Sequence, residues 1–240
     1  MGKARASRKQ AKNNYKNTNV VSFNKFQKQK SVTILPRNKN QETYVLKLLD
    51  ETKSIVFGIG PAGTGKTLLA VQVAVKYFKE GTVDKIIVTR PAVSVDEDLG
   101  ALPGTLEQKM APWTRPIFDV LREYFSTYEI ESMIQEGIIE IAPLSYMRGR
   151  TFKNSYIIAD EMQNATPNQM KMLLTRLGEG SKMAVTGDLN QADRKKDNGL
   201  VEFLDLMKEK STSKLDVVEF AKHDVERHDA VKEVLEMYGD

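Results

Sequence analysis

The segment Gly60-Pro61-Ala62-Gly63-Thr64-Gly65-Lys66-Thr67 decides the fold, because it matches the pattern G-x-x-x-x-G-K-[S/T] without a gap. A short apolar run at 54–59 precedes it, and apolar residues at helical spacing follow it over 66–79. Strand, glycine loop and helix in this order are the context in which the pattern forms a phosphate-binding loop. We therefore predict a P-loop at 60–67. The alternative, an ordinary glycine-rich turn, fits this context less well.

Each part of the predicted loop has a physical role. Glycines adopt backbone angles that let successive N–H groups converge on phosphate oxygens. The helix that follows adds about half an elementary positive charge at its first turn. We expect Lys66 to reach the β- and γ-phosphates of ATP, and the Thr67 hydroxyl to bind Mg²⁺.

A second motif follows about a hundred residues later, where the apolar run 155–159 ends in Asp160 and Glu161. In a P-loop protein, a carboxylate at the end of a nearby strand holds Mg²⁺, and we assign this role to Asp160. Glu161 would polarise the attacking water, since adjacent acids of this kind favour hydrolysis. Without the P-loop the motif would be weak, because many strands end in an acidic turn.

Two further polar groups are candidates for sensing the nucleotide. Asp188 follows the apolar run 182–186, and a polar group there senses the γ-phosphate and the activated water; the alternative is a turn residue. Gln163 and Asn164 follow the paired acids and would relay the state of the γ-phosphate to a substrate surface. They are equally typical of the start of a helix.

The pattern along the chain predicts one α/β domain. Strands at 54–59, 85–89, 138–142, 155–159, 182–186 and 215–220 alternate with helices at 41–53, 66–79, 167–177, 199–208 and 225–238. A further segment, 105–125, is predicted as mostly helical with interruptions at Pro112 and Pro116. This alternation predicts a mostly parallel sheet with helices on both faces. We expect the domain to span 32–240, with a loop at 91–104.

Composition excludes several classes of protein. The 240 residues contain 40% hydrophobic and 28% charged side chains, which is typical of a globular protein. The cysteine count is 0 and the histidine count is 2, which excludes a disulfide scaffold, a thiolate metal site and a cysteine nucleophile. The apolar runs are strand-length, and the N-terminus lacks the apolar core of a signal peptide. We expect a soluble, cytoplasmic protein.

The charge is concentrated at the N-terminus. Residues 1–40 contain 11 Lys or Arg and no Asp or Glu, whereas the remaining 200 residues carry a net charge of −7. We predict that 1–31 form a disordered basic arm, because this polar composition cannot bury enough apolar surface to fold. Such an arm, with Tyr15, Phe23 and Phe26 among its lysines, suits single-stranded nucleic acid. A solvated tail that aids solubility is the other interpretation.

Taken together, these motifs resemble the PhoH-like family of P-loop ATPases, in its short, single-domain, phage-type form. The resemblance covers about residues 34–238. Besides the P-loop, the matching segments are Thr89–Ala92, Leu99–Gly104, Met147–Phe152, Asp160–Asn164, Leu174–Gly178, Thr186–Asp188 and Val225–His228. The chain departs from the family pattern at Asp229 and Ala230, where Pro-Leu is usual after the Arg-His pair.

The resemblance implies a RecA-like core related to one motor domain of superfamily 1 helicases, with ATP hydrolysis and, in some members, action on RNA. Gln41 falls where helicase relatives place a glutamine that reads adenine. Arg227 falls where an arginine finger is natural, and such a residue is worth ~10³–10⁵ in rate. No RNase domain or KH-type extension is expected, and a phage-encoded chain would work in the host cytoplasm.

A helicase closes two RecA-like faces on one ATP, and this chain has only one such core. A neighbouring subunit would supply the second face, so we predict a homo-oligomeric ring, a hexamer, with ATP between subunits. Arg227 or Arg194 would then reach a neighbour's site. Arg90, Arg148 and Arg150 follow predicted strands, where open α/β sheets bind ligands, and are candidates for nucleic-acid or ATP phosphates. The alternative for Arg148 and Arg150 is a salt-bridged loop.

Three functions compete. The first is an ATPase motor on single-stranded RNA or DNA, with RNA favoured by the family. The second is an ATP-dependent switch or assembly factor that acts on a protein partner without unwinding, since the same nucleotide site serves both. The third, a phosphotransferase, is disfavoured by the paired acids and by the lack of a lid segment.

Overall fold

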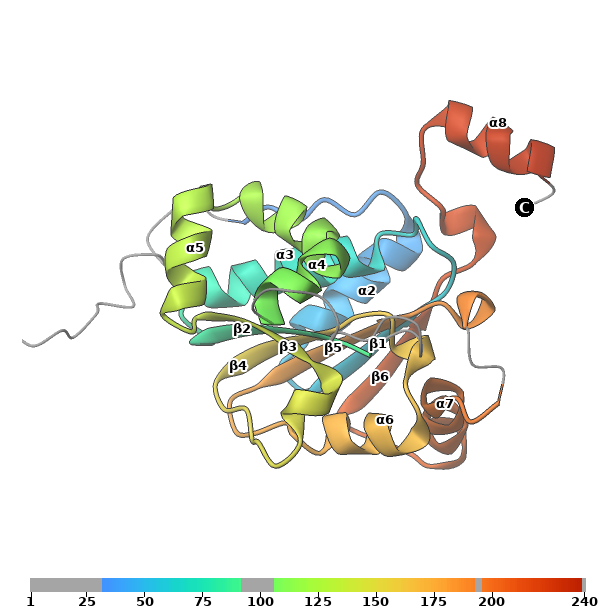
Figure 1. The fold of residues 1–240 in the computed structure, drawn as a ribbon. Helices are drawn as coiled ribbons and strands as arrows, with labels where there is room; N and C mark the ends of the chain where they lie inside the picture. Colours follow the sequence, from blue (N-terminus) through green and yellow to red (C-terminus); the bar gives the residue numbers. More distant parts are fainter. Residues whose placement is uncertain (1–31, 92–105, 193–195, 239–240) are drawn as a thin grey trace, which may run out of the picture.

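The computed structural model describes residues 32–91, 106–192 and 196–238. Its centre is a six-stranded sheet in which every pairing is parallel, with the order β3-β2-β4-β5-β1-β6 (Figure 1). The strands are β1 (Ile55–Ile59), β2 (Lys85–Arg90), β3 (Ile139–Pro143), β4 (Ser155–Ala159), β5 (Lys182–Gly187) and β6 (Leu215–Glu219). The predicted fold class is therefore confirmed.

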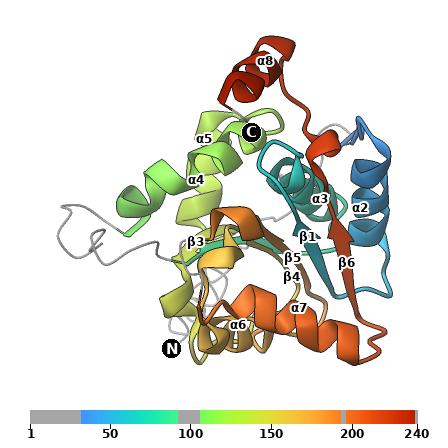
Figure 2. The same ribbon diagram turned by 90° about the vertical axis from the view of Figure 1, so that its right-hand side faces the viewer.

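Helices cover both faces of the sheet, as Figure 2 shows from the side. On one face lie α2 (Lys39–Leu49), α3 (Lys66–Lys79), α4 (Leu106–Arg122) and α5 (Thr127–Gln135). On the other lie α6 (Pro167–Leu174) and α7 (Gly199–Glu209). Every residue of β1, β4 and β5 is buried. A parallel strand covered on both faces reads as a continuous apolar run, which explains the sequence of these strands.

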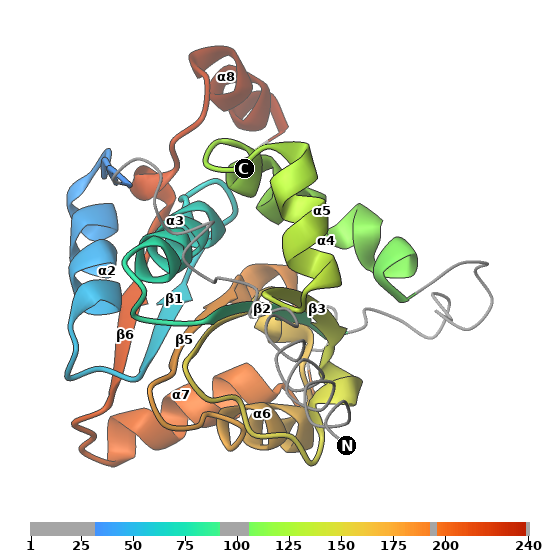
Figure 3. The same cartoon turned by 90° about the vertical axis from the view of Figure 1, so that its left-hand side faces the viewer.

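The last helix lies away from this layered body. α8 (Asp229–Tyr238) follows a short connection after β6 and stands apart from the other helices in Figure 1, and it lies at the outer end of the molecule in Figures 2 and 3. Its side chains Val231, Val234 and Met237 are 41%, 48% and 83% exposed. The helix starts later than the predicted residue 225, because Val225 to His228 run along the body before it.

Two helical predictions need correction. α4 continues from 106 to 122 through Pro112 and Pro116, so the predicted interruptions are wrong. Each proline removes one N–H donor and crowds the carbonyl four residues earlier, but the helix continues past both. α5 was not predicted at all. Its signal is a capping box, in which the Ser126 side chain accepts from the Glu129 backbone and the Glu129 carboxylate accepts from the Ser126 N–H. The predicted loop at 91–104 and arm at 1–31 lie almost wholly outside the described residues.

The strand order brings the two sequence motifs to one edge. β5 lies between β1, which leads into the P-loop, and β4, which ends at the paired acids. The register pairs Ile59 of β1 with Gly187 of β5, so both strands end at the same level. Because all strands are parallel, the P-loop, Asp160 and Asp188 share the carboxyl edge of the sheet.

At the opposite, amino-terminal end of β5, a buried lysine ties two helices to the sheet. Lys182 is 9% exposed, and its Nζ donates to the Asp50 carbonyl at 2.7 Å and to the Tyr77 hydroxyl at 3.1 Å. Burial lowers the pKa of Lys182 to about 8, although Asp50 and Glu51 oppose the effect.

This lysine predicts an alkaline gain in stability. The pKa of Lys182 is lower in the folded than in the unfolded chain, so from about pH 8 to pH 10 the unfolded chain binds more protons. The free energy of unfolding of the native chain, relative to Lys182→Met, should rise through this window by up to about 3 kcal/mol. Urea denaturation at successive pH values measures it. Lys171→Met, at an exposed lysine of α6, should show no such rise.

Candidate nucleotide site at the carboxyl edge

The P-loop needs its glycines for two separate reasons. Gly60, Gly63 and Gly65 have φ of 145°, 82° and 83°, backbone angles that residues other than glycine rarely adopt. Space is also restricted: a Cβ on Gly60 would lie 2.3 Å from the Phe220 carbonyl oxygen, and one on Gly63 would lie 2.5 Å from Nε of Arg227. The loop is thus held against the segment that follows β6.

Lys66 begins α3 and is 8% exposed. Its Nζ donates to the carbonyls of Gly60 at 2.7 Å and Pro61 at 2.6 Å, and to the Thr64 hydroxyl at 3.2 Å. Burial lowers the pKa of this ammonium group, while Asp188, Glu161 and Asp160 counteract the effect. A phosphate bound to the loop would compete with neutral oxygens for this cation, and the charged partner makes the stronger hydrogen bond.

Asp160 joins three elements of the site. Its Oδ1 accepts from the Thr67 hydroxyl of α3 at 2.8 Å and from the Thr186 hydroxyl of β5, and its own N–H donates to the Thr89 carbonyl of β2 at 2.9 Å. The carboxylate is 8% exposed. A hydroxyl beside a carboxylate fits Mg²⁺, which is typically bound by one or two side chains together with phosphate oxygens and water. Within the described part of the chain, no group of three or more His, Asp or Glu side chains could hold a metal.

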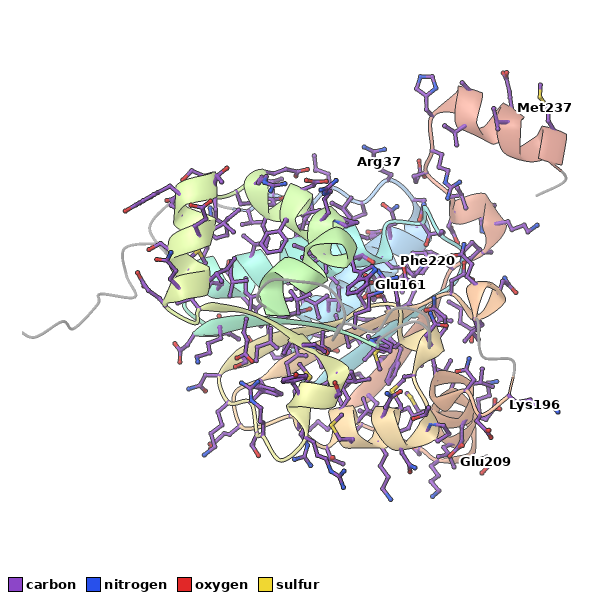
Figure 4. The ribbon with its side chains drawn as sticks, viewed as in Figure 1. Arg37, Glu161, Lys196, Glu209, Phe220 and Met237 are labelled. Atoms are coloured by element: carbon purple, nitrogen blue, oxygen red, sulfur yellow. The ribbon has the colours of Figure 1, made fainter. Side chains whose placement is uncertain are left out.

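Glu161 has a left-handed backbone, with φ 55° and ψ 38°. A non-glycine residue in this region costs of order 1–3 kcal/mol, and such residues concentrate at functional sites. Its Oε2 accepts from Nε2 of Gln163 at 2.5 Å, and Gln163 is only 1% exposed. The Glu161 side chain lines the same cleft as the P-loop. Figure 4 shows Glu161 near the right-hand, carboxyl ends of the strands.

A chain of hydrogen bonds connects Glu161 to the P-loop. Oε1 of Gln163 accepts from the Asp188 N–H at 3.1 Å, and Oδ2 of Asp188 accepts from the Ala62 N–H at 3.1 Å. Asp188 is 6% exposed, and its second oxygen, Oδ1, accepts from the Asn190 N–H at 3.0 Å, so the carboxylate contacts the P-loop and also caps the turn after β5. Its sensing of the γ-phosphate stays a prediction. A cleft lies over these groups, lined by the loop, by Asp160 and Glu161, and by 186–188 with Gln191.

Gln41 is placed differently from an open base-reading residue. It is 4% exposed; its Oε1 accepts from the Arg37 N–H at 2.8 Å and its Nε2 donates to the Thr64 carbonyl at 3.1 Å. Both ends of the amide are therefore used within the chain, and Gln41 ties the start of α2 to the P-loop. Its reading of adenine stays a prediction that would require these bonds to exchange.

The three arginines proposed for nucleic acid have different surroundings. Arg150 pairs with Glu140 through both of its terminal nitrogens, and its guanidinium carbon lies 4.6 Å from the centre of the Phe152 ring. This ion pair raises the pKa of Arg150 and gives it the alternative role, a salt bridge within the chain. Arg148, two residues before Arg150, is exposed on the loop after β3.

Of the three arginines proposed for nucleic acid, Arg90 alone lies beside the candidate nucleotide site. It ends β2 and lines a second, polar hollow with Glu161, Gln163, Asn164, Asn190, Gln191 and Ala192. Its Nε is buried and has no hydrogen-bond partner among the residues that the structure describes.

Arg227 lies at the P-loop of its own chain, over Gly63. The expectation that it reaches a neighbouring subunit stays a prediction, and Arg194 lies outside the described residues. Sequence reasoning missed the polar contacts that hold this segment, such as Asn38 with Glu226. No local pattern could have shown them, because 188 positions separate the two residues.

The strand order identifies the class of protein. A single strand, β5, separates the P-loop strand from the acid strand, and this is the arrangement of the RecA-like P-loop NTPase fold. The chain belongs to the PhoH-like family, because the family model described as "PhoH-like protein" matches residues 33–239. The resemblance seen in the motifs is thereby confirmed.

Curated relatives support the same family assignment. A "PhoH-like protein" of Bacillus subtilis (strain 168) is 47% identical over 211 residues, which cover 87% of this chain and 65% of the relative. A "PhoH-like protein" of Mycobacterium tuberculosis (strain H37Rv) is 45% identical, and "Protein PhoH" of Escherichia coli (strain K12) is 41% identical, each covering 86% of this chain and 58% of the relative. The chain thus spans about three fifths of the length of these relatives.

Solved structures with partial likeness include the Sulfolobus solfataricus SWI2/SNF2 ATPase core in complex with dsDNA, with a TM-score of 0.42, 15% identity and coverage of 65% of this chain and 33% of that one. Bacteroides Pif1 bound to ssDNA has a TM-score of 0.34 and 17% identity, covering 85% of this chain and 46% of that one.

No helix in the described ranges is long and apolar enough to span a membrane.

The double use of Asp160 predicts a stability effect at Thr186, which is 1% exposed. Thr186→Val removes one donor to a buried carboxylate while keeping the side-chain shape. Hydrogen bonds to charged groups contribute about 1.5–3 kcal/mol, so the free energy of unfolding at pH 7 should fall by that amount. Urea denaturation measures it. Thr175→Val, at an exposed hydroxyl that donates to the Met172 carbonyl, is the control and should change stability by less than about 1 kcal/mol.

Proposed function

We propose that this protein hydrolyses ATP in a Mg²⁺-dependent reaction that is coupled to single-stranded nucleic acid, with RNA favoured. One observation carries the proposal: the Thr67 hydroxyl and the Asp160 carboxylate meet at 2.8 Å beside the P-loop, with Glu161 next in the chain. The first two groups are suited to the metal of a metal–nucleotide complex, and the third is suited to a water molecule.

The residues divide the work as follows. The loop N–H groups and Lys66 would hold the β- and γ-phosphates, and Thr67 and Asp160 would hold Mg²⁺, whose charge would offset that of the phosphate oxygens. Glu161 accepts a proton from water while the water oxygen bonds to the γ-phosphorus. The bond from that phosphorus to the β–γ bridging oxygen breaks, and ADP leaves with its electron pair. Asp188 and Gln163 hold Glu161 and Ala62 in a fixed relation.

The polar hollow at Arg90 supports coupling to nucleic acid. Arg90 supplies a cation for a backbone phosphate, and Asn164 and Asn190 supply amides that suit base edges or sugar hydroxyls. Glu161 lines both this hollow and the nucleotide cleft, and Gln163 lines the hollow and donates to the Glu161 carboxylate. A strand bound at Arg90 would therefore contact the residue that positions the catalytic glutamate.

The remaining parts of the proposal concern assembly and location. We propose a homo-oligomeric ring, a hexamer, that works in the cytoplasm, with the basic arm at 1–31 adding contacts to nucleic acid. A second candidate, an ATP-dependent switch that acts on a protein partner, is favoured by α8. Three of its apolar side chains are exposed, and Figure 4 shows Met237 projecting near the end of that helix.

The proposal predicts nucleic-acid-stimulated hydrolysis. Steady-state ATP turnover should require Mg²⁺, should rise on addition of single-stranded RNA, and should fall by at least about 10²-fold in Glu161→Gln, since general base catalysis contributes 10²–10⁴. Glu161-dependent turnover that neither RNA nor single-stranded DNA changes would contradict the coupling and favour the protein-directed switch. Turnover equal in Glu161→Gln would contradict the site itself.

Arg90 should carry more of the coupling than the other loop arginines. Arg90→Ala should weaken RNA binding by roughly tenfold and reduce the slope of log affinity against log salt by about 1. Arg150→Ala should change RNA affinity less than twofold, because its charge is paired with Glu140. Fluorescence anisotropy with a labelled oligonucleotide at several salt concentrations distinguishes them. Equal losses in both variants would remove the special role of the Arg90 hollow.

A further inference from the structure

The segment Phe220–Arg227, here called the C-terminal strap, runs from the end of β6 across the P-loop. The Phe220 N–H donates to the Ile59 carbonyl at 2.7 Å, and the Glu226 N–H donates to the Gly63 carbonyl at 3.0 Å. The absence of a side chain on Gly60 allows the Phe220 carbonyl to approach. The strap is therefore bonded to the loop at its first residue and again near its apex.

Two asparagines hold the strap from the other side. Nδ2 of Asn38 donates to the Glu226 carboxylate at 3.1 Å and to the Asp224 carbonyl at 3.2 Å, and Nδ2 of Asn40 donates to the Asp224 carboxylate at 2.7 Å. Asp224 is 3% exposed and also accepts from the Ala221 N–H. A strap with this many polar contacts to α2 and the loop has a defined position on its own chain.

This position puts Arg227 over the P-loop. A Cβ built on Gly63 would lie 2.5 Å from its Nε and 3.3 Å from its Cζ, so the guanidinium rests against the backbone of the loop apex. Among the described residues, Arg227 makes no ion pair or hydrogen bond. A phosphate bound to the converging backbone N–H groups of the loop would give this guanidinium an anionic partner.

We propose that Arg227 contacts the terminal phosphates of ATP bound to its own subunit, so that the arginine of the site is supplied in cis. This inference rests on the proposed function and replaces a neighbour's arginine with the chain's own. Gly63 follows Ala62, whose N–H is bonded to Asp188. Gly63 also lines the cleft that contains Asp160, Glu161 and Asp188, so the guanidinium rests against a residue in the wall of the candidate nucleotide site.

A cross-linking experiment tests the cis arrangement. The chain contains no cysteine, so thiols introduced by Asn38→Cys and Glu226→Cys are the only ones present. A short, reducible bis-thiosulfonate reagent should link them within one chain, as seen from migration at single-chain mass in a denaturing gel together with an intact mass that has gained one spacer and lost both free thiols. The linked protein should keep ATP turnover within about twofold of the untreated double variant.

Three results would overturn the inference: links that join two chains, no link within a chain, or a link within a chain that abolishes turnover until it is reduced. The last result would mean that the strap must leave its own loop to act. The gel result does not depend on hydrolysis, so a failure of the cis geometry is distinguished from a failure of the proposed ATPase.

Nucleotide binding tests the phosphate contact itself. In equilibrium dialysis, Arg227→Ala should weaken binding of Mg²⁺–ATP by roughly tenfold or more and change binding of ADP less than twofold, since a charge-assisted bond contributes about 1.5–3 kcal/mol. Arg227→Lys should recover part of the difference. Arg122→Ala, in an exposed ion pair of α4, is the matched control. Equal weakening of ATP and ADP, or none of either, would contradict the contact.

Discussion

The site depends on the Oδ1 atom of Asp160. It accepts from Thr67 at the start of α3 and from Thr186 on β5, while the backbone of the same residue is bonded to β2. One carboxylate thus fixes the distance between the P-loop helix and the two central strands. The remaining groups, Glu161, Gln163 and Asp188, take their positions from this arrangement. Because the carboxylate is buried, replacing it leaves two hydroxyls without an acceptor, a cost that surface acids do not carry.

The P-loop is also bound by groups of its own chain that compete with a nucleotide. Lys66 donates to loop carbonyls, and the Asp188 carboxylate accepts from the Ala62 N–H. A phosphate bound to the loop exchanges with these contacts. Displacing Asp188 from Ala62 would act on Gln163, which accepts from the Asp188 N–H and donates to Glu161. This short series of bonds gives a physical route from the phosphate loop to the hydrolytic acid and to the Arg90 hollow beside it.

Much of this could be predicted from sequence, because the strongest signals are local. Fully buried parallel strands are continuous apolar runs, which the sequence shows directly. The P-loop glycines and the acids after β4 stand at the ends of such runs, so the same pattern predicts both the sheet and the motifs. Interior helices were harder: α4 continues through Pro112 and Pro116, and α5 is indicated only by its capping box. Contacts between distant segments left no pattern at all. The strap that carries Arg227 to Gly63 depends on the folded arrangement. A salt bridge is one of the two roles that the sequence leaves open for Arg150, and only the fold identifies Glu140 as its partner.

The central claim is that Thr67 and Asp160 form the metal side of a nucleotide site, and calorimetric titration of ATP with and without Mg²⁺ tests it most directly. The account predicts that Mg²⁺ tightens ATP binding to the native chain. In Asp160→Asn, which keeps the shape of the side chain and loses its charge, most of that gain should disappear while metal-free binding persists. An equal gain from Mg²⁺ in both proteins would contradict the account, because the metal would then be held without Asp160.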